Sequence, residues 1–234
     1  MTEVPAGRAN KAVAVAGLVL ALAILAGGVR QLSDAGEALA FDATAKSIHD
    51  GIPVPRTALA SLASRAFSLN ADRKLHGAAL EDASIVTGAF ALSPDVAPVV
   101  RPAMLISAEN VVRARLAEAP ADSHAWIRLA VLRDARLGLD ATTLEALRMS
   151  RLTGRREFAV MWPSLRFRVA HWDGLPPEER DAASDIVAGL WRRASRPDLI
   201  AYFTSLPPTM RGKLLASMTD QDAKTALVPL AAKP

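Results

Sequence analysis

The sequence predicts an all-α protein with one apolar helix near its N-terminus, followed by a domain of antiparallel helical hairpins. Three observations carry this prediction. Residues 12–29 form an unbroken apolar run, apolar residues then recur at spacings of three and four, and Gly or Pro breaks the pattern about every 15–25 residues. Alternating stretches rich in Val, Ile and Thr and bounded by turns, which are typical of strands, are missing from the sequence.

The apolar run predicts a transmembrane helix. Residues 12–29 carry no charged or hydrogen-bonding side chain over eighteen positions. With a rise of ~1.5 Å per residue, such a helix is about 27 Å long, close to the ~30 Å hydrocarbon core of a bilayer. A cleaved signal peptide is the alternative, although its apolar core usually has only ~7–15 residues.

Charges around this run predict its orientation. Arg8 and Lys11 precede it, whereas acidic residues predominate just after it, and positive charge is retained on the cytoplasmic side. We therefore expect residues 1–11 in the cytoplasm, a linker at 30–35 and a helical domain over 36–234 in the periplasm. The protein is then expected to be a single-pass protein of a bacterial inner membrane.

The composition limits the chemistry of that domain. The chain has no cysteine, which excludes disulfides, thiolate metal ligands and a cysteine nucleophile. Its formal net charge is +4, and its excess of arginine over lysine is typical of a GC-rich bacterial genome. Nucleic acid is not an expected partner, because the domain is expected to be exported and stacking aromatics do not alternate with its arginines.

The pattern predicts four helices in the first half of the domain. Leu62, Ala66 and Leu69 illustrate the helical spacing of apolar residues. Prolines stand between the helical segments, because proline is not accommodated inside a regular helix. The segments expected to be helical are 36–50, 56–69, 70–92 and 103–118, with an irregular segment over 94–102.

Later breaks divide the second half into further hairpins. Gly138 and Gly154 interrupt the helical pattern, and pairs of prolines at 176–177 and 207–208 stand where new helices are expected to begin. The whole domain is therefore expected to contain about ten helices that are joined by short turns.

The spacing of residues around Trp126 is more specific than the general helical pattern. Pro120 precedes Trp126 by six residues, and Leu129 and Ala130 follow Trp126 by three and four. This spacing resembles the junction between two tetratricopeptide (TPR) repeats. The resemblance implies a TPR-like domain with a repeat-like core at about 94–206. At the junction, Trp126 is expected to be buried between paired helices, while Leu129 and Ala130 face inward.

Residues 120–206 also resemble the periplasmic TPR-like domains of membrane-anchored accessory proteins of bacterial exopolysaccharide synthesis and export. The matching elements are Ala125-Trp126, Leu129-Ala130, the turn from Ser150 to Gly154, Trp172 before Leu175, the Glu179-Arg180 helix start and Leu190-Trp191. The resemblance carries no catalytic residue. It implies a non-catalytic scaffold that is tethered to the inner membrane, binds another envelope protein and assists polysaccharide biosynthesis or export. An assembly factor for another envelope complex is an alternative.

The sequence lacks the residue patterns of known catalytic and cofactor sites. The four histidines are scattered and no phosphate-binding glycine motif occurs, so we expect no cofactor and no metal. The alternative is a cell-wall lytic or transferase enzyme that uses carboxylates around 173–181. The carboxylates of that segment are Asp173, Glu178, Glu179 and Asp181. Two of them follow a pair of prolines directly, so they are also the acids that the first turn of a helix favours.

Arginines around the break at Gly154 are the candidate binding residues. They are Arg148, Arg151, Arg155 and Arg156, and further arginines recur at 166, 168, 192, 193 and 196. On stacked hairpins such side chains line one ridge, where they bind phosphate or carboxylate groups of an anionic polymer or a lipid head group. Trp172 is the candidate for an exposed ring that stacks on a sugar. The alternative is that the arginines pair with acids such as Glu145 and Asp185 on a solvated surface.

Overall fold

Every regular element in the described part of the chain is a helix. The computed structural model describes residue 36 and residues 38–154, 157–193 and 196–231. A helix over 38–49 comes first. It is followed by α2 (Arg56–Ala71), α3 (Gly77–Leu92), α4 (Arg101–Glu118), α5 (Ser123–Leu137), α6 (Ala141–Gly154), α7 (Phe158–Ala170), a 3-10 turn η1 (Trp172–Gly174), α8 (Pro177–Arg193), α9 (Arg196–Ser205), α10 (Pro208–Ser217) and α11 (Gln221–Ala231). The predicted all-α class is confirmed for these residues.

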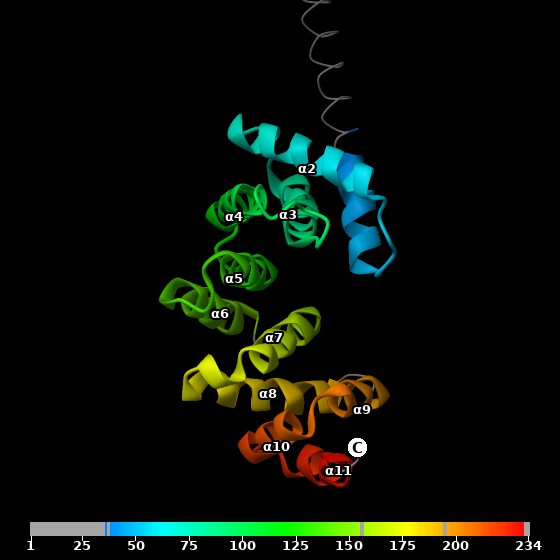
Figure 1. The fold of residues 1–234 in the computed structure, drawn as a ribbon, viewed down its shortest axis with the longest axis vertical. Helices are drawn as coiled ribbons and strands as arrows, with labels where there is room; N and C mark the ends of the chain where they lie inside the picture. Colours follow the sequence, from blue (N-terminus) through cyan, green and yellow to red (C-terminus); the bar gives the residue numbers. More distant parts are fainter. Residues whose placement is uncertain (1–35, 37, 155–156, 194–195, 232–234) are drawn as a thin grey trace, which may run out of the picture.

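The helices are stacked along one long axis (Figure 1). From α2 to α9 each helix packs against the next one in the chain, and alternate helices also meet, as α3 does with α5 and α5 with α7. Because the connections are short, consecutive helices are antiparallel and form hairpins. Helices α5, α7 and α9 begin at residues 123, 158 and 196, so successive hairpins start about 35 to 38 residues apart.

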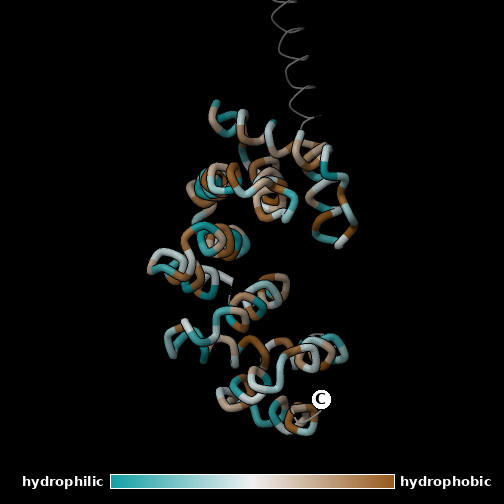
Figure 2. Tube along the Cα trace, viewed as in Figure 1, coloured by the Kyte–Doolittle hydropathy of each residue, from teal (hydrophilic) through white to brown (hydrophobic). Residues whose placement is uncertain are grey.

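The apolar core follows the stack in three clusters. One surrounds Phe41, Leu80 and neighbouring side chains of α2 and α3, a second lies mainly among α4, α5 and α6, and the third joins α7 to α11. Helix α7 belongs to two of them, because Phe167 packs in the second cluster and Leu165 in the third. Figure 2 accordingly shows hydrophobic positions along the whole length of the stack. Burial of apolar surface between successive helices is therefore what holds the hairpins together.

The predicted boundaries hold in the first half of the domain with one exception. The expected helix over 70–92 begins only at Gly77, after a turn at 72–76. Gly77 has a φ of +55°, a left-handed backbone conformation that favours glycine. Its N–H donates to a carboxylate oxygen of Glu118 at 2.9 Å, which anchors the start of α3 to the end of α4.

The residues of the repeat-like junction lie largely where the spacing predicts. Pro120 stands in the turn after α4, and Leu129 and Ala130 of α5 are buried, as expected. Trp126 packs against the second core cluster but is only half-buried, so the prediction of a ring enclosed between two helices is wrong. The reason is that its indole N–H donates to the Pro120 carbonyl at 2.8 Å, which holds one edge of the ring at the surface turn.

The predicted membrane anchor lies outside the described residues, as do the cytoplasmic tail and the linker. Among the helices that the structure describes, none combines the length and the hydrophobicity that crossing a bilayer requires. The transmembrane helix at 12–29 therefore stays a prediction from the sequence.

The contact between the end of α6 and the start of α5 requires a glycine. A Cβ added to Gly154 would lie 2.3 Å from the Cβ of Ser123, which is itself only 1% exposed. We expect Gly154→Ala to lower the free energy of unfolding by about 1–3 kcal/mol, because no space for a methyl group remains between the end of α6 and Ser123. Urea denaturation followed by circular dichroism measures the change.

Gly212→Ala is the matched control, because Gly212 is an exposed position inside helix α10 and a Cβ there meets nothing within 4 Å. That variant is expected to be more stable than the wild type by about 0.5–1 kcal/mol. Equal effects of the two substitutions would contradict the predicted contact at Gly154.

Protonation of Asp140 is expected to make the stability of the fold depend on pH in the acid range. The backbone N–H of Thr143, the Thr143 side chain and Arg133 lower the pKa of Asp140 from its ordinary 3.8 to about 2. The stabilising contribution of the carboxylate is therefore complete above its unfolded pKa and is lost as the pH falls towards about 2. We expect the difference in melting temperature between wild type and Asp140→Asn to shrink across this range. A difference that stays constant from about pH 5 to pH 2 would contradict this role.

Candidate functional site

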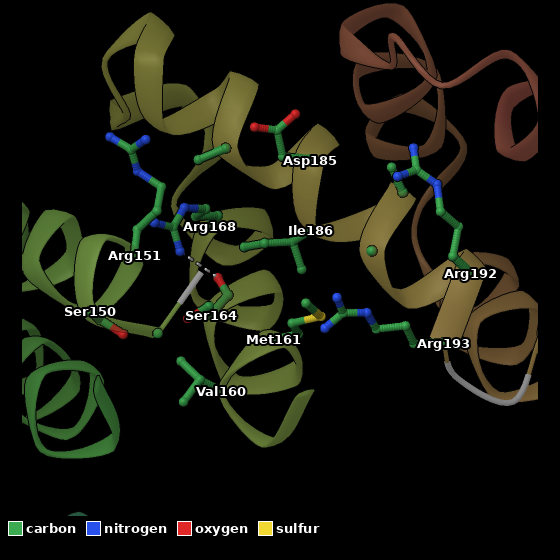
Figure 3. Close-up of a pocket in the computed structure, with 14 residues that line it drawn as sticks. Ser150, Arg151, Val160, Met161, Ser164, Arg168, Asp185, Ile186, Arg192 and Arg193 are labelled. Atoms are coloured by element: carbon green, nitrogen blue, oxygen red, sulfur yellow. Dashed lines mark hydrogen bonds between the residues drawn. The ribbon is translucent and has the colours of Figure 1, made fainter. Parts of the chain in front are cut away.

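A groove of about 480 Å³ lies where α6, α7 and α8 meet (Figure 3). Its size is within the range of ordinary ligand sites. Side chains at helical spacing from α7 and α8 form its two long walls, and the end of α6 closes one end. The residues of α7 are Val160, Met161, Ser164 and Arg168, and those of α8 are Ala182, Asp185, Ile186, Ala188, Gly189, Arg192 and Arg193.

Apolar side chains also line the groove. Val160 and Met161 are buried, and Ile186 is half-buried. A Cβ on Gly189 would lie 3.1 Å from the terminal methyl of Met161, so glycine at this position lets α8 come close to the thioether. Because Val160 and Met161 are buried, the apolar surface that the groove offers to a ligand is small, and no aromatic ring lines it.

A fully buried ion pair lies at one end of the groove. Arg168 is 0% exposed and Glu179 is 2% exposed. The Arg168 guanidinium donates to Glu179 Oε2 from Nη2 at 2.5 Å and from Nε at 3.1 Å, and its Nη1 donates to the Ser164 carbonyl at 3.2 Å. Burial lowers the pKa of Arg168, an effect that the Glu179 charge opposes. This pair fixes the position of α8 against α7.

Arg151 adds a second guanidinium beside the same carboxylate. Its Nε lies 3.7 Å from Glu179 Oε1, too far for a hydrogen bond, and this buried nitrogen has no hydrogen-bond partner among the described residues. Its side chain is 36% exposed. Because Arg151 and Arg168 share one carboxylate, this end of the groove carries excess positive charge. An incoming anionic group is the partner that such a guanidinium favours.

Two further arginines stand at the opposite end of the groove, in the last turn of α8. Arg192 donates to Asp220 at 2.5 Å, and its side chain points away from the groove toward the loop before α11, whereas Arg193 extends back toward Met161 (Figure 3). Asp185 is the one acidic residue of the lining, and it is exposed at the rim. The lining of the groove is therefore mainly polar, with arginines contributed by α6, α7 and α8.

The structure separates the predicted binding residues. Arg151 lines the groove, whereas Arg148 is exposed and pairs with Glu145 on its own helix at 2.7 and 2.8 Å. Arg155 and Arg156 lie outside the described residues. Trp172 is 5% exposed and packs in the third core cluster, so the prediction that its ring is free to stack on a sugar is wrong.

The carboxylates of segment 173–181 occupy different environments. Asp173 is exposed and pairs with Lys213 at 2.5 Å, whereas Glu179 is buried against Arg168. Glu178 and Asp181 are exposed in the first turns of α8. Because Glu179 serves an ion pair and Asp173 faces solvent, this segment shows no paired acid and base of the kind that glycoside hydrolysis uses.

Three of the histidines are engaged with carboxylates. His76 lies 2.7 Å from Glu118, His171 lies 2.9 Å from Asp134, and His124 lies 3.8 Å from Glu157. No cluster of three or more metal-ligating side chains occurs within the part of the chain that the structure describes. The arginine-lined groove is therefore the site whose lining indicates a ligand most clearly.

Comparisons with protein-family models, with curated proteins and with solved structures find no match for this chain. What the groove binds must therefore be inferred from the charge, shape and hydrophobicity of its lining. Those properties favour an anionic ligand.

Proposed function

We propose that this protein is a non-catalytic scaffold whose TPR-like domain binds an anionic segment of a partner protein in the groove between α6, α7 and α8. The observation that carries the proposal is the excess guanidinium charge of Arg151 and Arg168 around one buried carboxylate in the groove. Hairpins that start about 35 to 38 residues apart, with contacts between alternate helices, support the TPR-like assignment. Stacks of this kind present long rigid surfaces that suit protein binding.

We further propose that residues 12–29 tether this domain to a bacterial inner membrane, with the domain in the periplasm. The uncharged run and the basic residues before it support this topology. A tether raises the effective concentration of the domain near a partner that is held in the same membrane. The likeness of residues 120–206 to accessory proteins of exopolysaccharide synthesis and export makes that machinery the proposed source of the partner.

Photo-crosslinking in the native host tests the scaffold proposal. A photoreactive amino acid is placed at Ile186 in the groove, and in a second strain at Ile106, an exposed apolar residue of α4. The proposal predicts a defined adduct from position 186 that is absent from position 106 and is lost when Arg151→Gln is added. Identical adducts from both positions, or an adduct that Arg151→Gln leaves unchanged, would argue against the groove as the binding site.

A further inference from the structure

We infer that the loop between α3 and α4 docks on the membrane that holds the tether, with residues 97–100 entering the lipid interface. The inference rests on the proposed tether at residues 12–29 and does not involve the groove. Residues 93–100 have the sequence SPDVAPVV, in which Asp95 is the only charged residue. A surface loop with so few polar side chains is unusual, because loops are normally polar.

The tip of this loop is apolar and exposed. Residues 97–100 are alanine, proline and two valines, and all four are exposed. Val99 has 87% of its surface accessible to solvent, the largest value among the exposed large hydrophobic residues of the described chain, whereas Val96 is buried and attaches the loop to the domain. Single exposed apolar residues are common on protein surfaces, but a run of them indicates a surface that is covered by a partner.

The backbone of the loop is satisfied by donors within the protein. Nη2 of Arg101 donates to the carbonyls of residues 94 and 96 at 3.1 and 2.9 Å, and Nη2 of Arg56 donates to the carbonyl of Asp95 at 2.9 Å. The carbonyls of residues 93 and 97 each accept from the backbone N–H three positions later, at 3.2 and 3.0 Å. Five consecutive carbonyls therefore have partners that remain in place when water is removed, which lowers the cost of entering an apolar environment.

The turn before α2 adds a further apolar side chain to this edge of the domain. Arg56 is the first residue of α2, so its bond to Asp95 places the turn over 50–55 beside the loop over 93–100. Ile52 in that turn is 55% exposed, and the neighbouring Pro53 is exposed as well. Two adjacent loops thus present apolar side chains to the same surroundings.

The length of the chain before the domain makes a lipid surface the partner. Eight residues separate the predicted span at 12–29 from the helix over 38–49, and an extended chain of that length covers at most about 26 Å. The helix over 38–49 is about 18 Å long and leads directly into the turn over 50–55. This edge is therefore held close to the bilayer, where a few apolar side chains suffice for binding because the effective concentration is high.

The charges of the loop limit how deep it enters. Asp95 precedes the apolar tip, so it stays among the lipid head groups while residues 97–100 pass them. Segments that bind in this manner lie ~5–10 Å into the boundary between head groups and acyl chains. Arg56 and Arg101 place two guanidinium groups beside the single carboxylate of the loop, and this excess of positive charge favours anionic lipids.

Fluorescence of a label at position 99 tests the inference. The chain has no cysteine, so Val99→Cys in the full-length protein gives one site for a nitrobenzoxadiazole label. The protein is reconstituted in vesicles of phosphatidylethanolamine and phosphatidylglycerol, with and without lipids that carry a doxyl quencher on the acyl chain. Val228→Cys is the matched control, because Val228 is 50% exposed but belongs to α11, at the far end of the stack (Figure 1).

The label at position 99 is expected to have blue-shifted emission. Its quenching by doxyl lipids is expected to be at least about threefold stronger than at position 228, because only position 99 reaches the acyl-chain boundary. A second reporter at Ile52→Cys measures the contribution of the valines. Val99→Ser combined with Val100→Ser should reduce doxyl quenching at position 52, whereas Val228→Ser should not. Both valines are exposed, so these changes leave the core intact.

The outcomes separate this inference from the proposed function. Equal doxyl quenching at positions 99 and 228 overturns the inference. Blue-shifted emission at position 99 without doxyl quenching also overturns it, because the loop is then covered by protein. In both cases the groove keeps its proposed role, which crosslinking at position 186 tests separately. If the vesicles do not retain the full-length protein, the proposed tether and this inference are both wrong.

Discussion

Glu179→Gln is expected to lower the free energy of unfolding by about 3–5 kcal/mol, the usual cost of removing one partner from a buried ion pair. The side chains of Arg168 and Glu179 are 1% and 3% exposed, and their guanidinium and carboxylate groups meet at 2.5 Å. Without the carboxylate charge, Arg168 stays buried with its charge uncompensated, and Arg151 loses the same neighbour. Urea denaturation of wild type and variant measures the difference.

The neighbouring Glu178→Gln is the control for this prediction. Glu178 is exposed in the first turn of α8, so its loss should cost less than about 1 kcal/mol. The paired replacement of Arg168→Met with Glu179→Leu removes both charges and should recover most of the stability that Glu179→Gln loses. A fully stable Glu179→Gln protein that has lost its biological function would instead point to a catalytic carboxylate.

Glu109→Gln is expected to have a similar effect in the second core cluster, about 3–5 kcal/mol. The Glu109 side chain on α4 is 4% exposed and accepts hydrogen bonds from Nε and Nη2 of Arg136 on α5 at 2.6 and 3.0 Å. Arg133 and Arg113 each place a nitrogen 3.7 Å from it. The Glu109 carboxylate therefore joins α4 to α5 mainly through Arg136, because Arg133 also pairs with Asp140 at 2.7 Å, and an amide does not replace its charge.

Glu145→Gln is the surface counterpart of this change. Glu145 and Arg148 are also linked by two hydrogen bonds, but their side chains are 51% and 50% exposed. Loss of an exposed pair should leave the free energy of unfolding nearly unchanged, because solvent screens the two charges. If Glu109→Gln and Glu145→Gln have equal effects in the same denaturation assay, the Glu109 cluster does not stabilise the packing of α4 on α5.

Local sequence patterns predict most of the helices because each one buries an apolar face whose spacing is visible in the sequence. The boundaries near prolines and at Gly138 agree with the structure, since these residues limit the backbone directly. The turn at 72–76 escaped prediction because the helical pattern continues across it. The backbone leaves the helix at Arg73, which has a φ of +54°, and the start of the next helix is held by Glu118, about forty positions later in the chain.

The residues that form the groove are harder to predict from the sequence than the helices are. The arginine cluster indicates Arg151, and the later recurrence of arginine includes Arg168 and Arg193, all of which line the groove. The spacing gives no sign that Glu179 is buried, because an acid after Pro177 is already explained by the start of a helix. The predicted exposure of the Trp172 ring is wrong for a similar reason. A tryptophan beside a turn is expected at the surface, but here its ring is buried in the third core cluster while the rest of the turn is exposed.

Complementation of a deletion strain tests the central claim, that the protein acts by binding and not by catalysis. Polymer export and envelope integrity are scored in strains that carry Arg151→Gln, Asp173→Asn, Glu178→Gln or Asp181→Asn, with the amount of folded protein measured in each. The account predicts that Arg151→Gln impairs function while the three exposed carboxylate variants match the wild type. Loss of function from one of these carboxylate variants in a folded, abundant protein would contradict it and indicate an enzyme.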